Sequence, residues 1–579
     1  MFLLPYATHI VNSLRLGMLE ASTAKNVVRK MSTRPPNVLI YTGRGKNSSA
    51  AFQNLKDFFG QCLSRDKYVL YQLKDESILR EPWQENTELL IVASDLSINL
   101  EESHKKSFEK FFRHQGKLLV FSKNISFSDN ISLGQLPIPD DEICFTEKMR
   151  KKPCSNVADV NTYVKVKPCK DLEVLAVTSK TSQPVIIQES RGKGILILST
   201  VTELISSIAL NGSTDNNIEK LMKILFCNLG MMCEDVPECP LTPAMLLVDQ
   251  KNKDLFLRCI QDLTSDYSFH GNGVTVSFTE DQDAIATVEN FSVITNPIPE
   301  GYSTVKFSQY KELLNTKHLG HVMIYTDVIT STQTIVNGSL RLLKELPHGL
   351  GVVVIARQQT VGKGRGGNAW LSPDGCLSFS FPLEIELNSN LGQRLPFVQH
   401  IAALAIVDAV RDISGYQHLD LRIKWPNDIY FGNKTKIGGI LVNSIIQGRC
   451  LWAVIGIGIN VDNHQPTTCI NEIIEQHKLS KKISKEELLA RILNKMEELV
   501  EDFQLNGPEI FLQKYYSRWL HSESKVRLDN EDGEIVTIKG LDDMGFLCVV
   551  NDLNEVKTLQ PDGNSFDMMK NLITVKTRK

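Results

Sequence analysis

The sequence predicts a multidomain chain of the α/β and α+β classes, and three observations carry this prediction. Strands alternate with helices directly after residue 36, which is typical of a parallel sheet with helices on its faces. Longer apolar strands interrupted by glycines follow in the second half, and short strands separated by turns end the chain from Lys525. The length of 579 residues agrees, because domains commonly span ~100–200 residues.

Residues 1–36 differ from the rest in composition. They hold five basic side chains against one acid, with frequent Ser and Thr. This composition is typical of a mitochondrial presequence, and a disordered cationic tail would explain it equally well. Met31 offers a second start that would remove most of the segment. We therefore expect a cytoplasmic protein with an additional mitochondrial form that depends on residues 1–36.

Residues 37–240 predict a parallel α/β module. The expected helices cover residues 52–62 and 105–113, because apolar side chains recur there at helical spacing. Short apolar runs bounded by turn residues predict the strands. The expected strands are residues 37–41, 68–73, 89–93, 117–121 and 194–198.

The following segments give signals of different strength. Residues 241–315 show only weak periodicity and are expected to connect two larger parts. Apolar residues at helical spacing from Leu395 to Ile413 predict a buried helix. Ser484 and Glu487 form a capping box, so a second core helix is expected to begin there. After Lys525, short apolar runs predict a small β domain.

A loop rich in glycine and cations, Gly362–Gly367, is the strongest functional signal. It follows the apolar strand of residues 350–356 and has the sequence Gly-Lys-Gly-Arg-Gly-Gly. Glycines let backbone N–H groups approach a negative charge, and an arginine can bind phosphate through two hydrogen bonds. The turn-rich residues 368–375 predict that no helix follows, which argues against a dinucleotide fingerprint. The loop is therefore expected to bind an anion.

A second polar cluster lies between two later strands. Pro426 predicts a bend after Lys424, and this bend presents Asn427 and Asp428. Lys436 follows at the start of an apolar strand. The residues alone leave open whether Asp428 and Lys436 form only a surface ion pair.

Taken together, these motifs resemble the catalytic domain of biotin–protein ligases between about residues 321 and 503. The whole chain is similar to the eukaryotic members of that family, the holocarboxylase synthetases. The matching motifs are Thr330–Gln333, Arg357–Gln359, Gly362–Gly367, Trp370–Pro373, Lys424–Asp428, Lys436–Val442 and Pro561–Met568.

The resemblance implies a division into domains. Residues 1–36 are a presequence-like or disordered tail, and 37–240 a glutamine-amidotransferase-like α/β module. Residues 241–315 connect this module to a biotin/lipoate-ligase-type α+β catalytic core at 316–520, and 521–579 form a small SH3-like β-barrel. The module is expected to lack amidotransferase activity, because Cys62 lies in a helical pattern without the Gly-x-Cys-x-Gly elbow.

The resemblance also implies the reaction and its residues. Biotin and Mg·ATP would give biotinyl-5′-AMP, and a lysine of a biotin-dependent carboxylase would then attack this adenylate. Lys436, Arg365 and Asp428 are the expected catalytic residues, and Asp428 could alternatively bind Mg²⁺. The residues expected around biotin and the adenylate are Ser331, Thr332, Gln333, Gln359, Gly362, Lys363, Gly364 and Gly439. Those expected to bind ATP are Trp370, Asn427 and Asn460.

The expected partners are the biotin carboxyl carrier domains of acetyl-CoA, pyruvate, propionyl-CoA and methylcrotonyl-CoA type carboxylases. A net charge of −3 argues against general DNA binding, and no apolar run approaches the ~18 residues of a membrane span. Twelve cysteines without a C-x-x-C pair argue against a zinc or disulfide framework. Two alternatives stay open, a lipoate–protein ligase of the same fold and a non-catalytic biotin-binding regulator.

Overall fold

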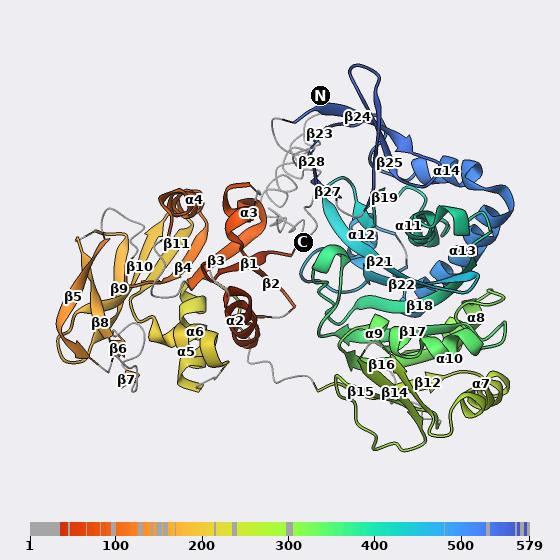
Figure 1. Cartoon of the computed structure of the whole chain (residues 1–579), viewed down its shortest axis with the longest axis horizontal. Helices are drawn as coiled ribbons and strands as arrows, with labels where there is room; N and C mark the ends of the chain where they lie inside the picture. The colour runs from red at the N-terminus through yellow and green to blue at the C-terminus, as the bar shows by residue number, and fades with distance from the viewer. Residues whose placement is uncertain are drawn as a thin grey trace, which may run out of the picture.

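The computed structural model describes residues 35–575 apart from short stretches, of which the longer ones are 94–99, 125–130, 146–152, 155–159, 234–239 and 297–304. Figure 1 shows two bodies side by side, one built from the chain before residue 234 and the other from the chain after residue 239. The expected tail at residues 1–34 lies outside the described residues. In the described part of the chain, no helix combines the length and the apolarity that a membrane crossing needs.

The first body is built on a nine-stranded mixed sheet of order β2-β1-β3-β4-β11-β10-β9-β6-β7. Its first five strands are parallel, and all five were predicted from the sequence. The remaining four run antiparallel to their neighbours. The strands are β1 (Asn37–Tyr41), β2 (Val69–Gln72), β3 (Thr87–Ala93), β4 (Lys117–Phe121), β6 (Ile143–Phe145), β7 (Pro153–Cys154), β9 (Leu172–Thr178), β10 (Pro184–Arg191) and β11 (Gly194–Ser199), and β5 (Ile131–Asp140) pairs separately with β8 (Val160–Val166).

Helices pack on this sheet through aromatic faces. In α4 (Glu102–Arg113), Phe108, Phe111 and Phe112 recur at helical spacing and are buried, which drives the helix onto the strands. Cys62 is the last residue of α2 (Ser48–Cys62), as predicted, and burial raises its thiol pKa to about 12. It is therefore an inert core thiol. The other helices are α3 (Asp75–Arg80), η1 (Trp83–Asn86), α5 (Glu203–Asn211) and α6 (Asn216–Asn228).

The second body contains an eleven-stranded sheet of order β13-β14-β15-β12-β16-β17-β18-β22-β21-β20-β19. Residues 241–315, expected only to connect, supply four of its strands. These strands have four to six residues each, so their periodicity is short and weak in the sequence. The strands are β12 (Ala244–Leu247), β13 (Ser268–Gly271), β14 (Val274–Thr279), β15 (Asn290–Ile294), β16 (Val322–Ile329), β17 (Val352–Gln359), β18 (Cys376–Glu386), β19 (Leu421–Lys424), β20 (Asp428–Phe431), β21 (Thr435–Gln447) and β22 (Cys450–Asn460).

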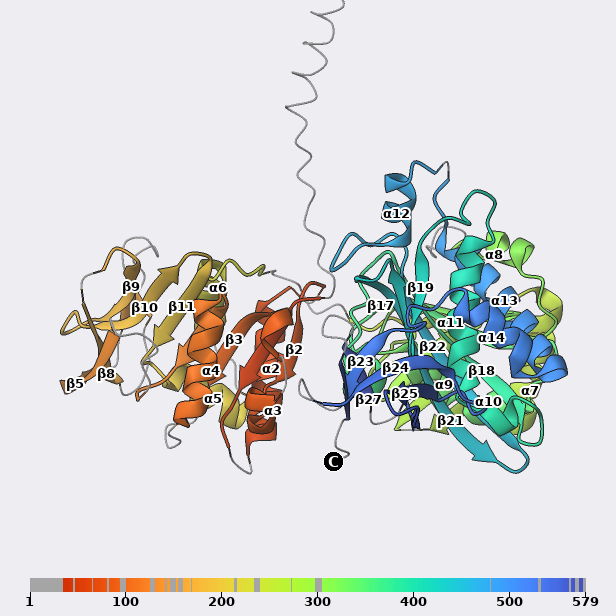
Figure 2. The ribbon, with the colours of Figure 1, turned by 90° about the horizontal axis from the view of Figure 1, so that it is seen from above.

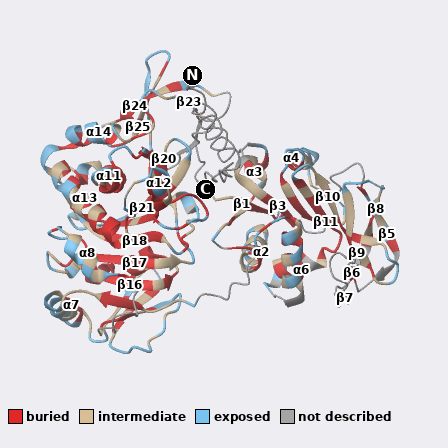
Figure 3. Ribbon diagram, turned by 180° about the vertical axis from the view of Figure 1, so that it is seen from behind, coloured by how far each residue is buried: buried red, intermediate tan, exposed pale blue. Residues whose placement is uncertain are grey.

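Two long helices cover the sheet, and both were predicted. α11 (Phe397–Arg411) is buried almost all round, and α13 (Lys485–Asn506) begins where the Ser484 side chain accepts a hydrogen bond of 3.1 Å from the Glu487 N–H. Figure 3 shows burial concentrated along the central strands β16, β17 and β18. The other helices are α7 (Gln250–Leu263), α8 (Phe307–Leu313), α9 (Thr332–Gly338), α10 (Leu340–Glu345), η3 (Arg365–Gly367), η4 (Gly392–Arg394), α12 (Ile470–Gln476) and α14 (Pro508–Tyr516).

A six-stranded sheet of order β26-β25-β24-β23-β28-β27 forms the C-terminal unit. Its strands are β23 (Lys525–Leu528), β24 (Ile535–Leu541), β25 (Leu547–Asn551), β26 (Val556–Leu559), β27 (Asn564–Asp567) and β28 (Leu572–Val575). His400 of α11 donates a hydrogen bond of 2.9 Å to the Gly545 carbonyl, which ties this unit to the core.

Two buried histidines predict that the fold loses stability in acid. Burial lowers the pKa of His400 to about 4 and that of His521 to about 3. Both stay neutral in the folded protein, whereas the unfolded chain gains a proton on each as the pH falls through ~6.5. We expect the melting temperature to fall progressively from about pH 6.5 toward pH 4. His400→Gln should flatten this slope and exposed His270→Gln should not, so equal slopes in thermal scans would contradict the assignment.

Candidate functional site

The polar strand ends and the glycine-rich loop surround one cavity of about 600 Å³. It lies over the carboxyl end of β17 and the neighbouring strands β18, β20, β21 and β22. Thirteen of the fourteen residues expected to form the site line it, although they come from six separate parts of the chain. These are Ser331, Thr332, Gln333, Gln359, Lys363, Gly364, Arg365, Trp370, Asn427, Asp428, Lys436, Gly439 and Asn460.

Gly362 is the exception, and its role differs from the expected one. A Cβ atom at this position would lie 2.3 Å from the Trp370 carbonyl oxygen. The Trp370 N–H donates a hydrogen bond of 2.9 Å to the Gly362 carbonyl. Gly362 therefore lets the two arms of the loop approach each other and does not face the cavity.

Between these arms the glycine loop (residues 362–370) makes a tight turn without a following helix, as the sequence predicted. Residues 365–367 form the short 3₁₀ turn η3, in which Gly366 has a positive φ of 68°. The Gly364 N–H donates a hydrogen bond of 2.7 Å to the Asn368 carbonyl, which closes the turn. The Arg365 guanidinium donates to the Pro561 carbonyl of the C-terminal unit. The loop is thus attached to a unit outside the eleven-stranded sheet.

The charged centre of the cavity is an ion pair between two adjacent strands. The Lys436 Nζ lies 2.7 Å from Asp428, and the Lys424 Nζ lies 4.0 Å from the other carboxylate oxygen. Lys424 is buried, whereas Asp428 and Lys436 are half-buried in the cavity wall. Two ammonium groups around one carboxylate leave a net positive charge. Such a centre favours an anionic ligand, because opposite charges attract at this short range.

Hydrogen bonds within the protein fix the bend at Pro426 and the side chain of Asn427 that follows it. The Trp425–Pro426 peptide is cis, and the Trp425 N–H donates a hydrogen bond of 2.9 Å to His521. The Asn427 amide donates to the Ile440 carbonyl at 2.7 Å. His521 was not recognised in the sequence, because it lies 96 positions from Trp425 along the chain.

A chain of neutral polar groups forms another wall. Gln359 accepts a hydrogen bond of 2.9 Å from the Thr332 N–H, and the hydroxyls of Thr332 and Ser380 share one of 2.7 Å. Gln333 donates to the Leu441 carbonyl at 3.0 Å and accepts from Asn443 at 3.1 Å. These bonds fix the side chains in place, so this wall is preorganised for a polar, uncharged part of a ligand.

Two glycines of β22 complete the cavity, and neither was among the site residues expected from the sequence. A Cβ atom on Gly458 would lie 2.4 Å from the Trp370 indole nitrogen, and one on Gly456 would lie 2.7 Å from the Gln333 amide nitrogen. Both glycines line the cavity and share one face of the strand. In the sequence, two glycines separated by one residue in an otherwise apolar strand could have indicated this role.

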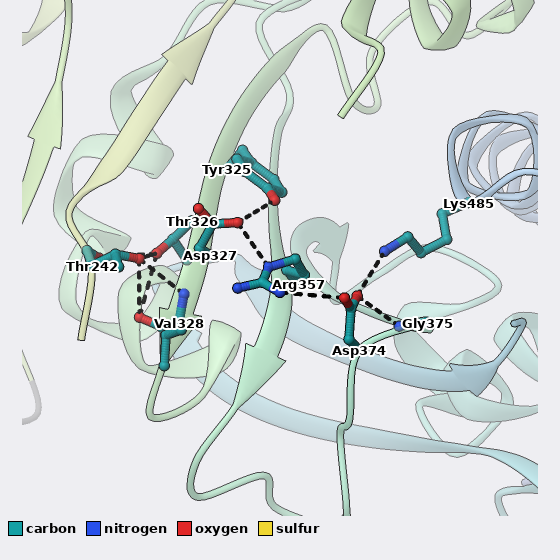
Figure 4. A network of polar contacts seen from close by, with 9 residues as sticks. All are labelled: Thr242, Tyr325, Thr326, Asp327, Val328, Arg357, Asp374, Gly375 and Lys485. Carbon is teal, nitrogen blue, oxygen red and sulfur yellow. Dashed lines mark hydrogen bonds and ion pairs between the residues drawn. The ribbon is translucent and has the colours of Figure 1, made fainter. Parts of the chain in front are cut away.

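Arg357 belongs to the motif Arg357–Gln359, but it does not line the cavity. Figure 4 shows it between Asp327 and Asp374, which accept its hydrogen bonds at 3.0 and 3.3 Å. Lys485 lies 3.8 Å from the other oxygen of Asp374. This network joins β16 and β17 to the turn after the glycine loop.

The donor atoms offer little to a metal ion held by protein alone. Asp428 is the single carboxylate among the described residues that line the cavity, and Lys436 already pairs with it. A different group, His464, Cys469 and Glu472, has ligand atoms within 4.8 Å of one another. Every cysteine whose side chain the structure describes is a free thiol.

Comparisons with known proteins agree on one family. The model of the biotin/lipoate A/B protein ligase family matches residues 325–460. A biotin–protein ligase of Homo sapiens is 34% identical over 578 residues, which cover 95% of this chain and 78% of that protein. Biotin–protein ligase 2 of Arabidopsis thaliana is 36% identical over 291 residues, covering 49% of this chain and 85% of that one.

Among solved structures, the biotin protein ligase from Aquifex aeolicus in complex with biotin and ATP is 27% identical. It covers 42% of this chain and 96% of its own, with a TM-score of 0.33.

Proposed function

The chain belongs to the biotin–protein ligase family in its eukaryotic form, and from this premise we propose how its residues carry out the reaction. The protein transfers biotin to other proteins in an ATP-dependent reaction. We propose that it does so in two steps, forming biotinyl-5′-AMP and pyrophosphate and then passing biotin to a lysine. The observation that carries this proposal is the cationic centre at Lys436, which lies beside a preorganised neutral wall in one cavity.

In the first step two anions must meet. Biotin's carboxylate attacks the α-phosphate of ATP, and two unit charges ~4 Å apart repel by about 4 kcal/mol at an effective dielectric near 20. We propose that Lys436 offsets this repulsion, and that Lys363 and the N–H groups of the glycine loop assist it. This proposal is supported by the position of Lys436, Lys363 and Gly364, which all line the same cavity. Fixed cations aimed at developing charge lower such a barrier without reorganisation.

Biotin and ATP would divide the cavity between them. Ser331, Thr332, Gln333 and Gln359 form the neutral polar wall, which suits the uncharged ring end of biotin. Trp370 supplies an aromatic surface for the adenine base. The Nζ of Lys436 lies 5.7 Å from the centre of that ring, where phosphate would follow the base.

Magnesium fits here as part of the substrate complex. Mg²⁺ commonly binds through one or two carboxylates together with substrate phosphates, and Asp428 is the one carboxylate among the described residues of the cavity wall. The phosphates would therefore hold most of its coordination sphere, and the ion would neutralise their charge. Because Asp428 contacts Lys436, we propose that it mainly orients this lysine and, in the second step, the amine of the acceptor.

The second step requires a neutral amine at the acceptor. A lysine has a pKa of ~10.4, so only a small fraction is neutral near pH 7. A carboxylate within hydrogen-bond reach can accept the proton as the amine attacks the acyl carbon, with AMP as the leaving group. We propose the carrier domains of acetyl-CoA, pyruvate, propionyl-CoA and methylcrotonyl-CoA type carboxylases as acceptors.

The domain assignments remain part of the proposal. The parallel half of the first sheet supports an amidotransferase-like module at 37–240 without activity, since Cys62 lies in a helix. The six short strands support an SH3-like unit at 521–579. Because β12 to β15 extend the large sheet, we propose that residues 241–315 fold with the catalytic core at 316–520.

The function is tested by incubating the full chain with ATP, labelled biotin and an apo carrier domain. The proposal expects biotin-dependent pyrophosphate release and label on one lysine of the carrier. Lipoate replacing biotin with equal efficiency would favour the lipoate ligase. Binding of biotin without pyrophosphate release would favour a non-catalytic regulator.

Replacing Arg365 by glycine should let the adenylate escape. A charged hydrogen bond contributes ~1.5–3 kcal/mol, so its loss corresponds to a release about ten- to a hundredfold faster. We expect Arg365→Gly to biotinylate bystander proteins such as serum albumin, with adenylate formation largely retained. Exposed Arg341→Gly is a control that lies outside the loop. Equal bystander labelling by Arg365→Gly and wild type would exclude Arg365 as the residue that retains the intermediate.

We also propose that residues 1–36 direct one form of the protein to mitochondria and that a form starting at Met31 stays in the cytosol. The support is their cationic, acid-poor composition. A reporter fused to residues 1–36 should enter mitochondria in fractionated cells. A wholly cytosolic reporter would contradict the proposal.

A further inference from the structure

The N-terminal body forms part of the wall of the catalytic cavity. Figures 1 and 2 both show β2, the edge strand of its sheet, as the strand nearest to the second body. Side chains of β1 and β2 and of the following turns line the same cavity as Lys436 and Arg365. They include Asn37, Leu39, Val69, Tyr71, Gln72 and Trp83.

One hydrogen bond joins this wall to the glycine loop. The Ala369 N–H donates to the Tyr71 hydroxyl at 3.3 Å. Ala369 pairs with Lys363 in an antiparallel bridge between the two arms of the loop. The hydrogen bond between Ala369 and Tyr71 therefore restrains both arms. Burial raises the pKa of Tyr71, so its hydroxyl stays protonated and available to accept this bond near neutral pH.

The loop is therefore held from two sides by units that supply none of the expected catalytic residues. Pro561 of the C-terminal unit accepts from Arg365, and Tyr71 of the N-terminal body accepts from Ala369. An adenylate in this cavity would have the loop on one side and β2 on the other. Excluding water from an activated acyl group protects it from hydrolysis.

We infer that Tyr71 is a positioning residue that holds the glycine loop closed over the adenylate, which makes the N-terminal body part of the device that retains the intermediate. This inference rests on the proposed adenylate reaction. It assigns the body a function at the active site that its inactive amidotransferase-like fold does not reveal. Tyr71 does not touch the reacting atoms, and it acts through the position of Ala369.

The test compares two tyrosines of the same body that make the same kind of bond. Tyr71→Phe keeps the ring and removes only the acceptor for Ala369. Tyr68→Phe is the matched control, because the Tyr68 hydroxyl likewise accepts from a backbone N–H, that of Met232 at 3.1 Å, and Tyr68 does not line the cavity. Each full-length variant receives ATP, labelled biotin, serum albumin and an apo carrier domain.

Tyr71→Phe should label albumin about two- to tenfold more than wild type, the range for one ordinary hydrogen bond. Without carrier, biotin-dependent pyrophosphate release by Tyr71→Phe should rise together with the labelling, because each adenylate that escapes is replaced by a new turnover. Tyr68→Phe should behave as wild type in both assays. Hydrogen exchange of a peptide covering residues 362–370 should quicken in Tyr71→Phe alone. This readout does not depend on catalysis.

Several results would overturn the inference. They are unchanged albumin labelling and loop exchange in Tyr71→Phe, equal changes in both variants, or a raised KM for the carrier without leakage. If wild type forms no adenylate from biotin and ATP, the proposed function fails as well. If wild type forms it and only the Tyr71 comparison is negative, the inference alone fails.

Discussion

Replacing Lys436 by alanine is expected to slow adenylate formation by about 10²–10³-fold, the scale for one fixed group that stabilises charge in a transition state. Lys436 is the ammonium in direct contact with Asp428 at the centre of the cavity. Without it, the proposed approach of biotin's carboxylate to the α-phosphate loses a fixed cation of the cavity wall. The substitution leaves the buried core intact, so we expect the variant to fold normally.

The measurement is biotin-dependent pyrophosphate release by purified full-length protein. Lys434→Ala is the matched control, because Lys434 lies on the same β-hairpin and is exposed, outside the cavity. It should retain wild-type activity. A folded Lys436→Ala variant that releases pyrophosphate at a near-normal rate would show that another group stabilises the reacting charge.

The second large effect is expected at Gly458. Its hydrogen faces the indole of Trp370, and the added methyl group of Gly458→Ala would lie 2.4 Å from the indole nitrogen. The ring must shift, and the proposed adenine surface shifts with it. Stacking of a base on an aromatic ring contributes ~1–3 kcal/mol, so we expect KM for ATP to rise about five- to 150-fold. KM for biotin should change less.

Two further variants isolate this cause. Ile459→Val removes one methyl group from the next residue of β22, which faces away from the cavity, and should leave KM for ATP unchanged. Adding Trp370→Phe to Gly458→Ala shortens the ring and should make the alanine less harmful than it is alone. Strictly additive effects of the two substitutions would contradict a steric conflict between them.

The sequence predicted the parts of this protein that local patterns determine. The capping box at Ser484 and the apolar strand expected at residues 350–356 are encoded within a few neighbouring positions, and the structure confirms both elements. The glycine loop was recognisable for the same reason, since its cations and glycines are contiguous.

Contacts between segments that lie far apart in the chain could not be predicted from the sequence. Nothing near Tyr71 indicates that it meets Ala369, because the two lie 298 positions apart. Gly362 was expected to face the ligand, and only the fold reveals that it makes room for the Trp370 carbonyl. The short strands of residues 241–315 join a sheet whose other strands extend from Val322 to Asn460. Each of these features depends on tertiary packing rather than on local propensity.

We propose that one cavity makes an enzyme-bound adenylate and passes its biotin to a single lysine. The most direct measurement is a single-turnover experiment with labelled biotin and ATP, followed by removal of free nucleotide and addition of an apo carrier domain. We expect wild type to hold labelled adenylate and to transfer it without further ATP, so that the carrier gains the mass of one biotinyl group on one lysine. A wild-type protein that holds no labelled adenylate, or a carrier that is labelled only when fresh ATP is added, would contradict this account.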